Sequence, residues 1–247
     1  MIRLGALALV LMSSHALAQG LPAGFVYLRD VDPGIAQDIR YAGADNFTGR
    51  PLPGYEAGEC ILRRDAAAAL KQVQADLAPS GLALKVYDCY RPVRASYAMA
   101  RWAQDGRDGG RQKRFYPRLE KSTLLAGYIA SVSRHSTGTA VDLTLIERAH
   151  GPAATFDPSA SYGPCTGPAA QRAPDDSLDM GTGFDCLDVN SRPRSTAVSA
   201  EQQRRRATLM AAMAKRGFQH YHREWWHFTF ATPAPGPHQD FAIRPRR

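Results

Sequence analysis

The segment that most constrains the fold is residues 64–87, where a helix pattern passes directly into a strand pattern. Residues 64–77 are rich in alanine and carry their larger apolar side chains at helical spacing. Pro79-Ser80-Gly81 interrupts that helix, and residues 82–87 then alternate as a strand does. The chain is therefore expected to contain helices and strands in close succession.

Further elements continue this order along the chain. Residues 92–104 indicate a helix with Pro92 in its first turn. Residues 139–145 alternate again, so that the apolar side chains point to one side of a strand and Asp142 points to the other. By contrast, residues 148–196 are rich in Pro, Gly, Ser and Asp, and they predict long irregular connections.

The last part of the chain adds a helix and one or two strands. Ser199-Ala200-Glu201-Gln202 is a capping box that opens a helix, and Gly217 ends it. The apolar side of this helix is expected to carry Ala207, Met210, Met213 and Ala214. Residues 218–230 indicate one or two strands. Because helices and strands interleave while the strands gather in hairpin-like segments, we predict an α+β fold, a single domain with a central antiparallel or mixed sheet covered by helices.

Composition agrees with a globular domain and argues against nucleic acid as a partner. The chain has 247 residues, of which 44% are hydrophobic and 22% charged, so it is long enough to bury a sizeable core. The formal charge is +8. The basic residues are scattered, however, and no interleaved platform of aromatic and basic side chains is evident.

The first residues predict an export signal. Arg3 precedes an apolar run over residues 4–12, and Ala16-Leu17-Ala18 matches the small-x-small pattern of a cleavage site. The apolar run is too short to cross a bilayer, and no later stretch approaches the length of a transmembrane helix. We therefore expect residues 1–18 to be a secretory signal peptide, residues 19–247 to form the mature domain, and the destination to be the periplasm or the outside of the cell.

Four cysteines remain in the chain, and none forms a C-x-x-C pair. In an oxidising compartment an even number suggests two disulfides, for which three connectivities are open. Cys165 and Cys186 bracket a segment with little apolar material to hold it, and a bridge there would restrict a loop of about 20 residues. We favour that pairing, which leaves Cys60 to pair with Cys89.

A candidate metal site comes from three residues that are far apart in the chain. His135 falls in a turn-like segment rich in Ser and Gly, and Asp142 lies within an apolar strand. A carboxylate there is costly to bury unless a cation or hydrogen bonds offset the lost water. Catalytic zinc sites use about three protein ligands, His nitrogens and carboxylate oxygens among them, plus one water. We therefore predict a zinc site formed by His135, Asp142 and, from a distant segment, His227.

Glu224 stands three residues before His227 in the stretch H-R-E-W-W-H-F-T-F. A water activated by zinc needs a base within hydrogen-bond reach, and Glu224 is the candidate. The alternative is that the tryptophans belong to the core and that His227 is only their hydrogen-bonded neighbour. Each spacing alone is a weak signal, but together in an exported chain they favour a zinc hydrolase over that alternative.

The stretch S-R-H-S-T-G-T-A-V-D, residues 133–142, resembles the S-x-H-x-x-G-x-A-x-D motif of the zinc peptidases that include the D-alanyl-D-alanine dipeptidases of the vancomycin-resistance type. The stretch E-W-W-H also matches that group. Three further stretches resemble its other conserved segments, namely residues 38–49 (D-I-R-Y-A-G-A-D-N-F-T-G), 86–92 (V-Y-D-C-Y-R-P) and 179–185 (D-M-G-T-G-F-D). These ordered matches cover most of the chain from about residue 25 to residue 230.

This resemblance implies a role for each matching residue. One zinc ion per chain would lie in a cleft on the sheet, bound by His135, Asp142 and His227. Glu224 would take a proton from the zinc-bound water and pass it to the leaving amine, and Arg91 would donate to the carbonyl oxygen as charge develops there. The substrate's ammonium would be held by Asp185 with Tyr41 near it, and its carboxylate would lie beside Ser133.

Each of these roles has a simpler structural alternative. Arg91 could pair with a surface carboxylate, and Asp185 could cap a turn in its glycine-rich loop. Tyr41 could be a core residue, and Ser133 could only brace the loop that carries His135. The long insert that contains Cys165 lies beyond what the motifs require, and it leaves strict dipeptide specificity open.

Three functions follow from this sequence. The first is a periplasmic zinc dipeptidase that cleaves free D-Ala-D-Ala, a small peptide released by cell-wall turnover. The second is a zinc D,D-carboxypeptidase or endopeptidase acting on peptidoglycan stem peptides, and the third is a non-catalytic, zinc-stabilised wall-binding module. An ammonium clamp at Asp185 favours the first, and Glu224 argues against the third, because a structural metal site needs no base. The sequence leaves the oligomeric state open.

Overall fold

The computed structural model describes residues 20–107, 109–149, 155–232 and 236–246. The expected signal peptide, residues 1–18, lies outside these ranges. A search of the described residues finds no helix with the length and apolar character needed to cross a membrane.

The centre of the molecule is a five-stranded sheet with the strand order β2-β4-β5-β7-β6. β2 pairs with β4 in parallel, and the other neighbours are antiparallel. The sheet is therefore mixed, as predicted. Its strands span Ala36–Gln37, Leu82–Asp88, Ala140–Glu147, His227–Phe230 and Phe218–His220, in that order. A separate antiparallel ribbon joins β1, Phe25–Tyr27, to β3, Ile61–Arg63.

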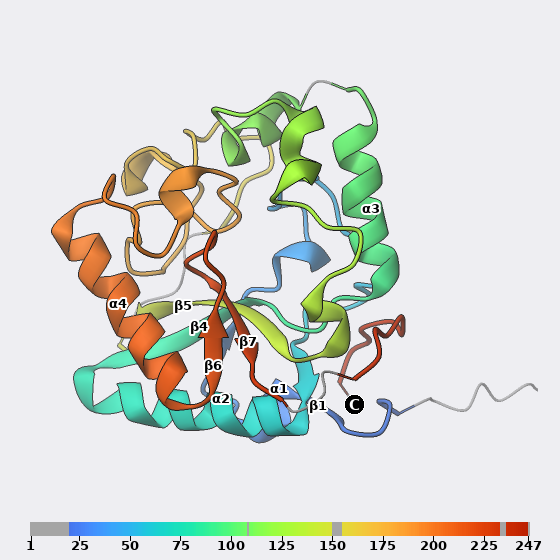
Figure 1. Cartoon of the computed structure of the whole chain (residues 1–247), viewed down its shortest axis with the longest axis vertical. Helices are drawn as coiled ribbons and strands as arrows, with labels where there is room; N and C mark the ends of the chain where they lie inside the picture. The colour runs from blue at the N-terminus through green and yellow to red at the C-terminus, as the bar shows by residue number, and fades with distance from the viewer. Residues whose placement is uncertain (1–19, 108, 150–154, 233–235, 247) are drawn as a thin grey trace, which may run out of the picture.

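The described residues form four α-helices, arranged around this sheet (Figure 1). They are α1, Leu28–Val31, α2, Arg64–Leu77, α3, Val93–Gln104, and α4, Ala200–Lys215. Helices α2 and α4 contact each other and pack on β4 and β5, while α3 stands to the right of the sheet in Figure 1. Residues 110–132 and 155–198 gather at the end of the molecule opposite to α2 (Figure 1).

Short 3-10 helices shape the connections. They are η1, Arg40–Ala42, η2, Ala78–Ser80, η3, Gly110–Phe115, η4, Lys121–Ala126, η5, Arg134–Thr137, η6, Ala169–Gln171, and η7, Val189–Ser191. The segment 148–196 has no longer helix or strand among its described residues, which confirms its prediction as irregular structure.

Helix α2 has the bounds that its sequence pattern predicts, and it buries Leu70, Val73 and Leu77. Gly81, at φ 71°, closes η2 in the left-handed region where glycine is favoured, and β4 begins at the next residue. The order helix, turn, strand is therefore confirmed in this segment.

The two faces of strand β5 have different surroundings. Val141 pairs with Phe228 of β7, and the next residue, Asp142, pairs with His227. Because side chains alternate across a strand, Val141 and Phe228 share one face of the sheet and Asp142 and His227 share the other. The first face belongs to the hydrophobic core. The second face carries Asp142 and His227, which belong to the predicted metal site.

Helix α4 corrects one sequence expectation. Its capping box is present, with Ser199 and Gln202 each accepting a hydrogen bond from the other's backbone N–H. The buried side chains are Arg206, Leu209 and Met213, whereas Ala207 and Ala214 of the predicted apolar side are exposed.

The reason for the rotated face is Arg206, which is only 1% exposed. Its guanidinium donates to the backbone carbonyls of Met180, Asn190 and Arg192, at 2.7 to 2.9 Å. These acceptors offset the lost water, so the arginine takes a core position that apolar spacing assigns to solvent.

Both expected disulfides are present. Cys60 bonds to Cys89, with the Sγ atoms 1.96 Å apart, and Cys165 bonds to Cys186 at 2.00 Å. The first bridge holds the end of β4 to the chain just before β3. The second holds the irregular segment that follows β5, as its composition required.

Candidate active site

Three ligand-type side chains converge on the face of the sheet that carries Asp142. The Nε2 atom of His135 lies 3.3 Å from Asp142 Oδ1 and 3.1 Å from His227 Nδ1, and Nδ1 of His227 lies 3.0 Å from the same Asp142 oxygen. The pairing of β5 with β7 places Asp142 and His227 opposite each other, and η5 brings in His135. The three predicted ligands are thus brought together.

The ring nitrogen of His135 that points away from the cluster also has a hydrogen-bond partner. Its Nδ1 lies 2.7 Å from the carbonyl oxygen of Cys89, and the Ser133 hydroxyl accepts a hydrogen bond from the His135 backbone N–H. When Nδ1–H donates to that carbonyl, the lone pair on Nε2 faces Asp142 and His227. This arrangement is common behind metal-ligating histidines, because it fixes both the tautomer and the ring orientation.

The donor set suits a divalent ion. Among the described residues, two imidazole nitrogens and one carboxylate oxygen lie within 4.8 Å of one another. His135 and Asp142 are 1% and 2% exposed, so the carboxylate depends on positive charge beside it. Burial alone would raise the pKa of Asp142, but the neighbouring imidazoles outweigh burial and hold that pKa below its usual range. Three such ligands leave a fourth position for water in a zinc site.

The tryptophans of the stretch E-W-W-H build the core under this site. Trp225 and Trp226 are both buried, and the Trp225 indole N–H donates to the Thr182 hydroxyl at 2.9 Å. The alternative that these residues form core is therefore correct for the tryptophans. Glu224 and His227, on either side of them, line the cavity, and Trp226 contributes to the same wall.

Glu224 lies beside the cluster without joining it. Its Oε2 atom is 3.9 Å from Nδ1 of His227. Burial is the main cause that raises the pKa of Glu224 to about 7, against the opposing pull of the His227 ring. A carboxylate with this pKa exchanges protons readily near neutral pH.

Arg91 points into the site rather than toward a surface carboxylate. Its Nη2 atom lies 2.8 Å from Oδ2 of the buried Asp88 and 3.7 Å from Oδ2 of Asp142. Its guanidinium carbon stands 4.9 Å from the centre of the Tyr41 ring. The surface alternative for Arg91 is therefore wrong.

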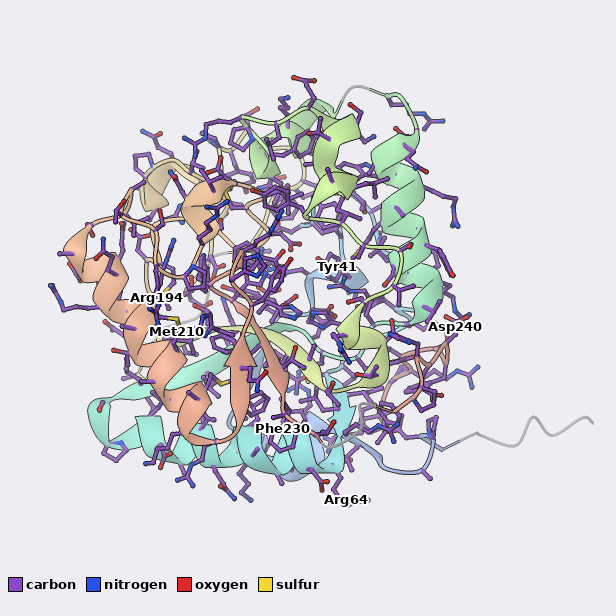
Figure 2. All side chains as sticks on the ribbon, in the orientation of Figure 1. Tyr41, Arg64, Arg194, Met210, Phe230 and Asp240 are labelled. Atoms are coloured by element: carbon purple, nitrogen blue, oxygen red, sulfur yellow. A yellow bond between two sulfur atoms is a disulfide. The ribbon has the colours of Figure 1, made fainter. Side chains whose placement is uncertain are left out.

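Asp185 and Tyr41 form a buried pair on the same cavity. The Tyr41 hydroxyl donates to Asp185 Oδ2 at 2.8 Å, and Tyr41 lies at the centre of the molecule in Figure 2. Asp185 has φ 56°, a left-handed conformation that is uncommon outside glycine. Burial raises the pKa of Asp185 well above its usual range, so a cation bound there would be needed to stabilise its charged form.

These side chains line a single cavity of about 750 Å³. The residues from the sequence motifs that line it are Tyr41, Arg91, Ser133, His135, Asp142, Asp185, Glu224 and His227. The segment Leu125–Arg134 and the β6–β7 hairpin supply much of the rest of the wall. Every predicted catalytic, metal and substrate residue therefore faces one space, although the contact of Ser133 within the protein is the bracing one to His135.

Sequence reasoning missed Asp88, which is completely buried and contacts Arg91, Tyr55 and the ring of His135. Asp88 stands three residues before Arg91 in the stretch V-Y-D-C-Y-R-P. An aspartate at the end of an apolar strand was a signal of the same kind as Asp142, since both would be costly to bury without partners.

Comparison with known proteins gives a consistent result. A model of the M15 peptidase family, described as D-ala-D-ala dipeptidase, matches residues 22–157 and 154–243. The D-alanyl-D-alanine dipeptidase of Enterococcus faecalis is 33% identical over 222 residues, which cover 89% of this chain and 98% of that protein. The proteins of the same name from Streptomyces coelicolor and Escherichia coli are 34% and 31% identical, over 89% and 86% of this chain and 98% and 87% of their own lengths.

Proposed function

Because the chain belongs to the M15 peptidase family of D-alanyl-D-alanine dipeptidases, and is therefore a metal-dependent peptidase, we propose a specific reaction for it. The proposed reaction is the hydrolysis of free D-Ala-D-Ala, with one bound zinc ion and Glu224 as general base. The observation that carries the proposal is the cluster of His135, Asp142 and His227, with Glu224 beside it in one cavity.

In this proposal His135, Asp142 and His227 hold the zinc ion. The ion supplies Lewis acidity, which makes an adjacent water molecule more acidic and polarises the scissile carbonyl. Glu224 takes a proton from that water onto a carboxylate oxygen. The oxygen of that water bonds to the carbonyl carbon, and Glu224 then passes the proton to the nitrogen of the leaving D-alanine as the C–N bond breaks.

Arg91 stabilises the charge that develops during this step. Its guanidinium faces the cavity beside Asp142, and we assign it to donate to the carbonyl oxygen of the scissile bond. A donor in this position contributes about 3 kcal/mol of transition-state stabilisation.

The Asp185–Tyr41 pair is suited to hold the substrate's ammonium. The partner of Asp185 is a neutral hydroxyl, and burial disfavours its charged form in the free protein. An ammonium group at hydrogen-bond distance would supply the missing positive charge. Ser133, next to the ligand His135 on the cavity wall, is our candidate for contact with the substrate's carboxylate.

A second candidate function is a D,D-carboxypeptidase or endopeptidase on peptidoglycan stem peptides. The observation that favours it is the cavity volume of about 750 Å³, which falls in the range that holds drug-sized ligands. The Asp185–Tyr41 pair argues for the dipeptidase, because a free ammonium next to the scissile bond exists only in a short substrate.

The test of the proposed function is a parallel assay of three peptides with zinc-reconstituted protein. We expect D-Ala-D-Ala to be cleaved and its L,L isomer to be a much poorer substrate. A pentapeptide that ends in D-Ala-D-Ala should remain intact. Faster cleavage of the pentapeptide than of the dipeptide would establish the second candidate instead.

We also propose that the protein is exported. The support is the amino-terminal pattern of Arg3, an apolar run and Ala16-Leu17-Ala18, together with two disulfides. Amino-terminal sequencing of periplasmic protein should begin near Gln19, and an intact Met1 would contradict export by this signal.

A further inference from the structure

We propose that Asp88 is a positioning residue, a buried carboxylate that fixes the Arg91 guanidinium so that it meets the carbonyl oxygen of the substrate. This inference rests on the proposed function, because it assigns Asp88 to act through Arg91.

A local irregularity of β4 brings Asp88 to the site. Val86 pairs with Leu143 of β5, but Asp88 pairs with the adjacent Asp142, so Tyr87 is an extra residue on β4. Without this bulge, alternation would leave Asp88 on the same face as Val86, in the core. The bulge turns Asp88 to the face that carries Asp142.

Asp88 is fully buried, and both of its carboxylate oxygens are occupied. Oδ1 accepts a hydrogen bond from the Tyr55 hydroxyl at 2.6 Å. Oδ2 accepts from Arg91 Nε at 2.9 Å and lies 2.8 Å from Arg91 Nη2. Because the Asp88 side chain is 0% exposed, solvent does not replace these partners, and the carboxylate depends on the guanidinium beside it.

The contact through Nε and Nη2 sets the plane of the guanidinium. An arginine held by a carboxylate along one edge keeps a defined direction for its remaining N–H groups. The other contacts of Arg91 are weaker guides, namely the face of the Tyr41 ring and the Met99 sulfur at 3.5 Å from Nη1. Asp142 is farther away, at 3.7 Å, and its Oδ1 lies toward the two imidazoles.

Asp88 also stands next to the metal ligands, so its effect must be separated from theirs. Its Oδ2 atom is 3.5 Å from His135 Nδ1, while the carbonyl of Cys89 lies closer to that nitrogen, at 2.7 Å. The shorter contact indicates that the backbone orients His135. The contact through which we expect Asp88 to affect catalysis is therefore the one to Arg91.

The experiment is a double-mutant cycle on kcat/KM for D-Ala-D-Ala with zinc-loaded protein, using Asp88→Asn, Arg91→Ala and the two combined. Asparagine keeps the shape of the side chain but lacks the charge and the second oxygen. We expect Asp88→Asn to lower kcat by about 100-fold with little change in KM. In the Arg91→Ala background the same substitution should lower kcat/KM by less than about 3-fold.

The control is Asp175→Asn, which makes the same change at a carboxylate paired with an arginine outside this cavity. Its kcat/KM per folded molecule should stay parental. Zinc affinity, measured by competition with a chromophoric chelator, should be unchanged within about 3-fold in Asp88→Asn. A fall in zinc affinity that accounts for the lost activity would overturn the proposal, because Asp88 would then act through His135.

The proposal would also be overturned if the losses of kcat/KM from Asp88→Asn and Arg91→Ala were additive. A general structural role of Asp88 would lower kcat/KM by the same factor in both backgrounds. If Asp88→Asn does not fold, Arg91→Lys decides the question, because lysine keeps the charge but loses the contact through two nitrogens. We expect Arg91→Lys to lose nearly as much kcat as Arg91→Ala, and parental kcat would refute the role of Asp88. Failure of the parental protein to cleave D-Ala-D-Ala would instead refute the proposed function.

Discussion

Glu224, on the turn between β6 and β7, and His227, the first residue of β7, are three residues apart, yet they differ in what they touch. The Nδ1 atom of His227 contacts Asp142 and His135 directly, whereas Glu224 stands 3.9 Å from that nitrogen at the edge of the cluster. In the proposed mechanism, His227 binds the ion and Glu224 exchanges protons beside it.

The first prediction at this scale concerns the base. Glu224→Gln keeps the size of the side chain but removes its ability to take a proton. We expect zinc content to stay near one per chain while kcat falls by about 1,000-fold. Metal analysis and turnover of D-Ala-D-Ala on the same sample measure both quantities. Parental turnover in the variant would show that another group is the base.

The second prediction concerns the ligand. His227→Ala should lose zinc as well as activity, because only two ligands would remain. His222→Ala is the matched control, since His222 is exposed on the same turn and does not line the cavity. The control should bind zinc with parental affinity. Equal zinc affinity in both variants would remove His227 from the site.

At the scale of elements, the irregular segment after β5 is attached to the sheet through Asp175. Its side chain is 19% exposed although its backbone lies at the surface, and it contacts Arg40 at 3.0 Å, Lys85 at 2.5 Å and the Tyr87 hydroxyl at 2.7 Å. Burial alone would raise the pKa of Asp175, but Arg40 and Lys85 outweigh it and lower that pKa from 3.8 to about 2.

This shift predicts how stability depends on pH. Because the folded state favours the ionised carboxylate, its contribution is fully present above about pH 4 and is lost as the pH falls toward 2. Asp175→Asn should therefore cost about 2 kcal/mol of unfolding free energy at pH 7, and the difference from the parental protein should shrink in acid. Urea unfolding of both metal-free proteins at pH 7 and pH 3 measures this. A constant difference would show that the charge of Asp175 is unimportant.

The two disulfides lead to different functional predictions although they close loops of similar length, with sequence separations of 29 and 21 residues. Each should contribute about 3 to 4 kcal/mol to stability by chain entropy. Cys89 lies between Asp88 and Arg91, and its carbonyl accepts from His135, whereas Cys186 follows Asp185.

Replacing Cys60 and Cys89 together by alanine should therefore lower kcat, and replacing Cys165 and Cys186 by alanine should mainly raise KM for D-Ala-D-Ala. Steady-state kinetics below the unfolding temperature of each variant tests the split. The same kinetic change in both variants would mean that the bridges act only on overall stability.

At the scale of the whole molecule, the two faces of the central sheet have different roles. Helices α2 and α4 cover one face and make the core, while the other face carries the cavity that collects residues from Tyr41 to His227. Spacing and turn residues predicted α2, β4 and β5, because their signals are local. The convergence of His135 and His227 on Asp142 was also predictable, since a buried carboxylate in a strand requires a partner.

The remaining features depend on contacts that local patterns do not contain. Arg206 is buried because carbonyls from a distant segment meet it, and those carbonyls have no sequence signal. Asp88 reaches the site because β4 bulges at Tyr87, which only the register with β5 reveals. Apolar spacing alone would predict Arg206 to face solvent and the position of Asp88 to hold a hydrophobic side chain.

We propose that these distant segments form a single zinc site. Anomalous diffraction at the zinc edge, from crystals of the reconstituted protein, tests it most directly. We expect one strong peak about 2 Å from His135 Nε2, His227 Nδ1 and a carboxylate oxygen of Asp142. A peak elsewhere in the molecule, with none among these three side chains, would contradict it.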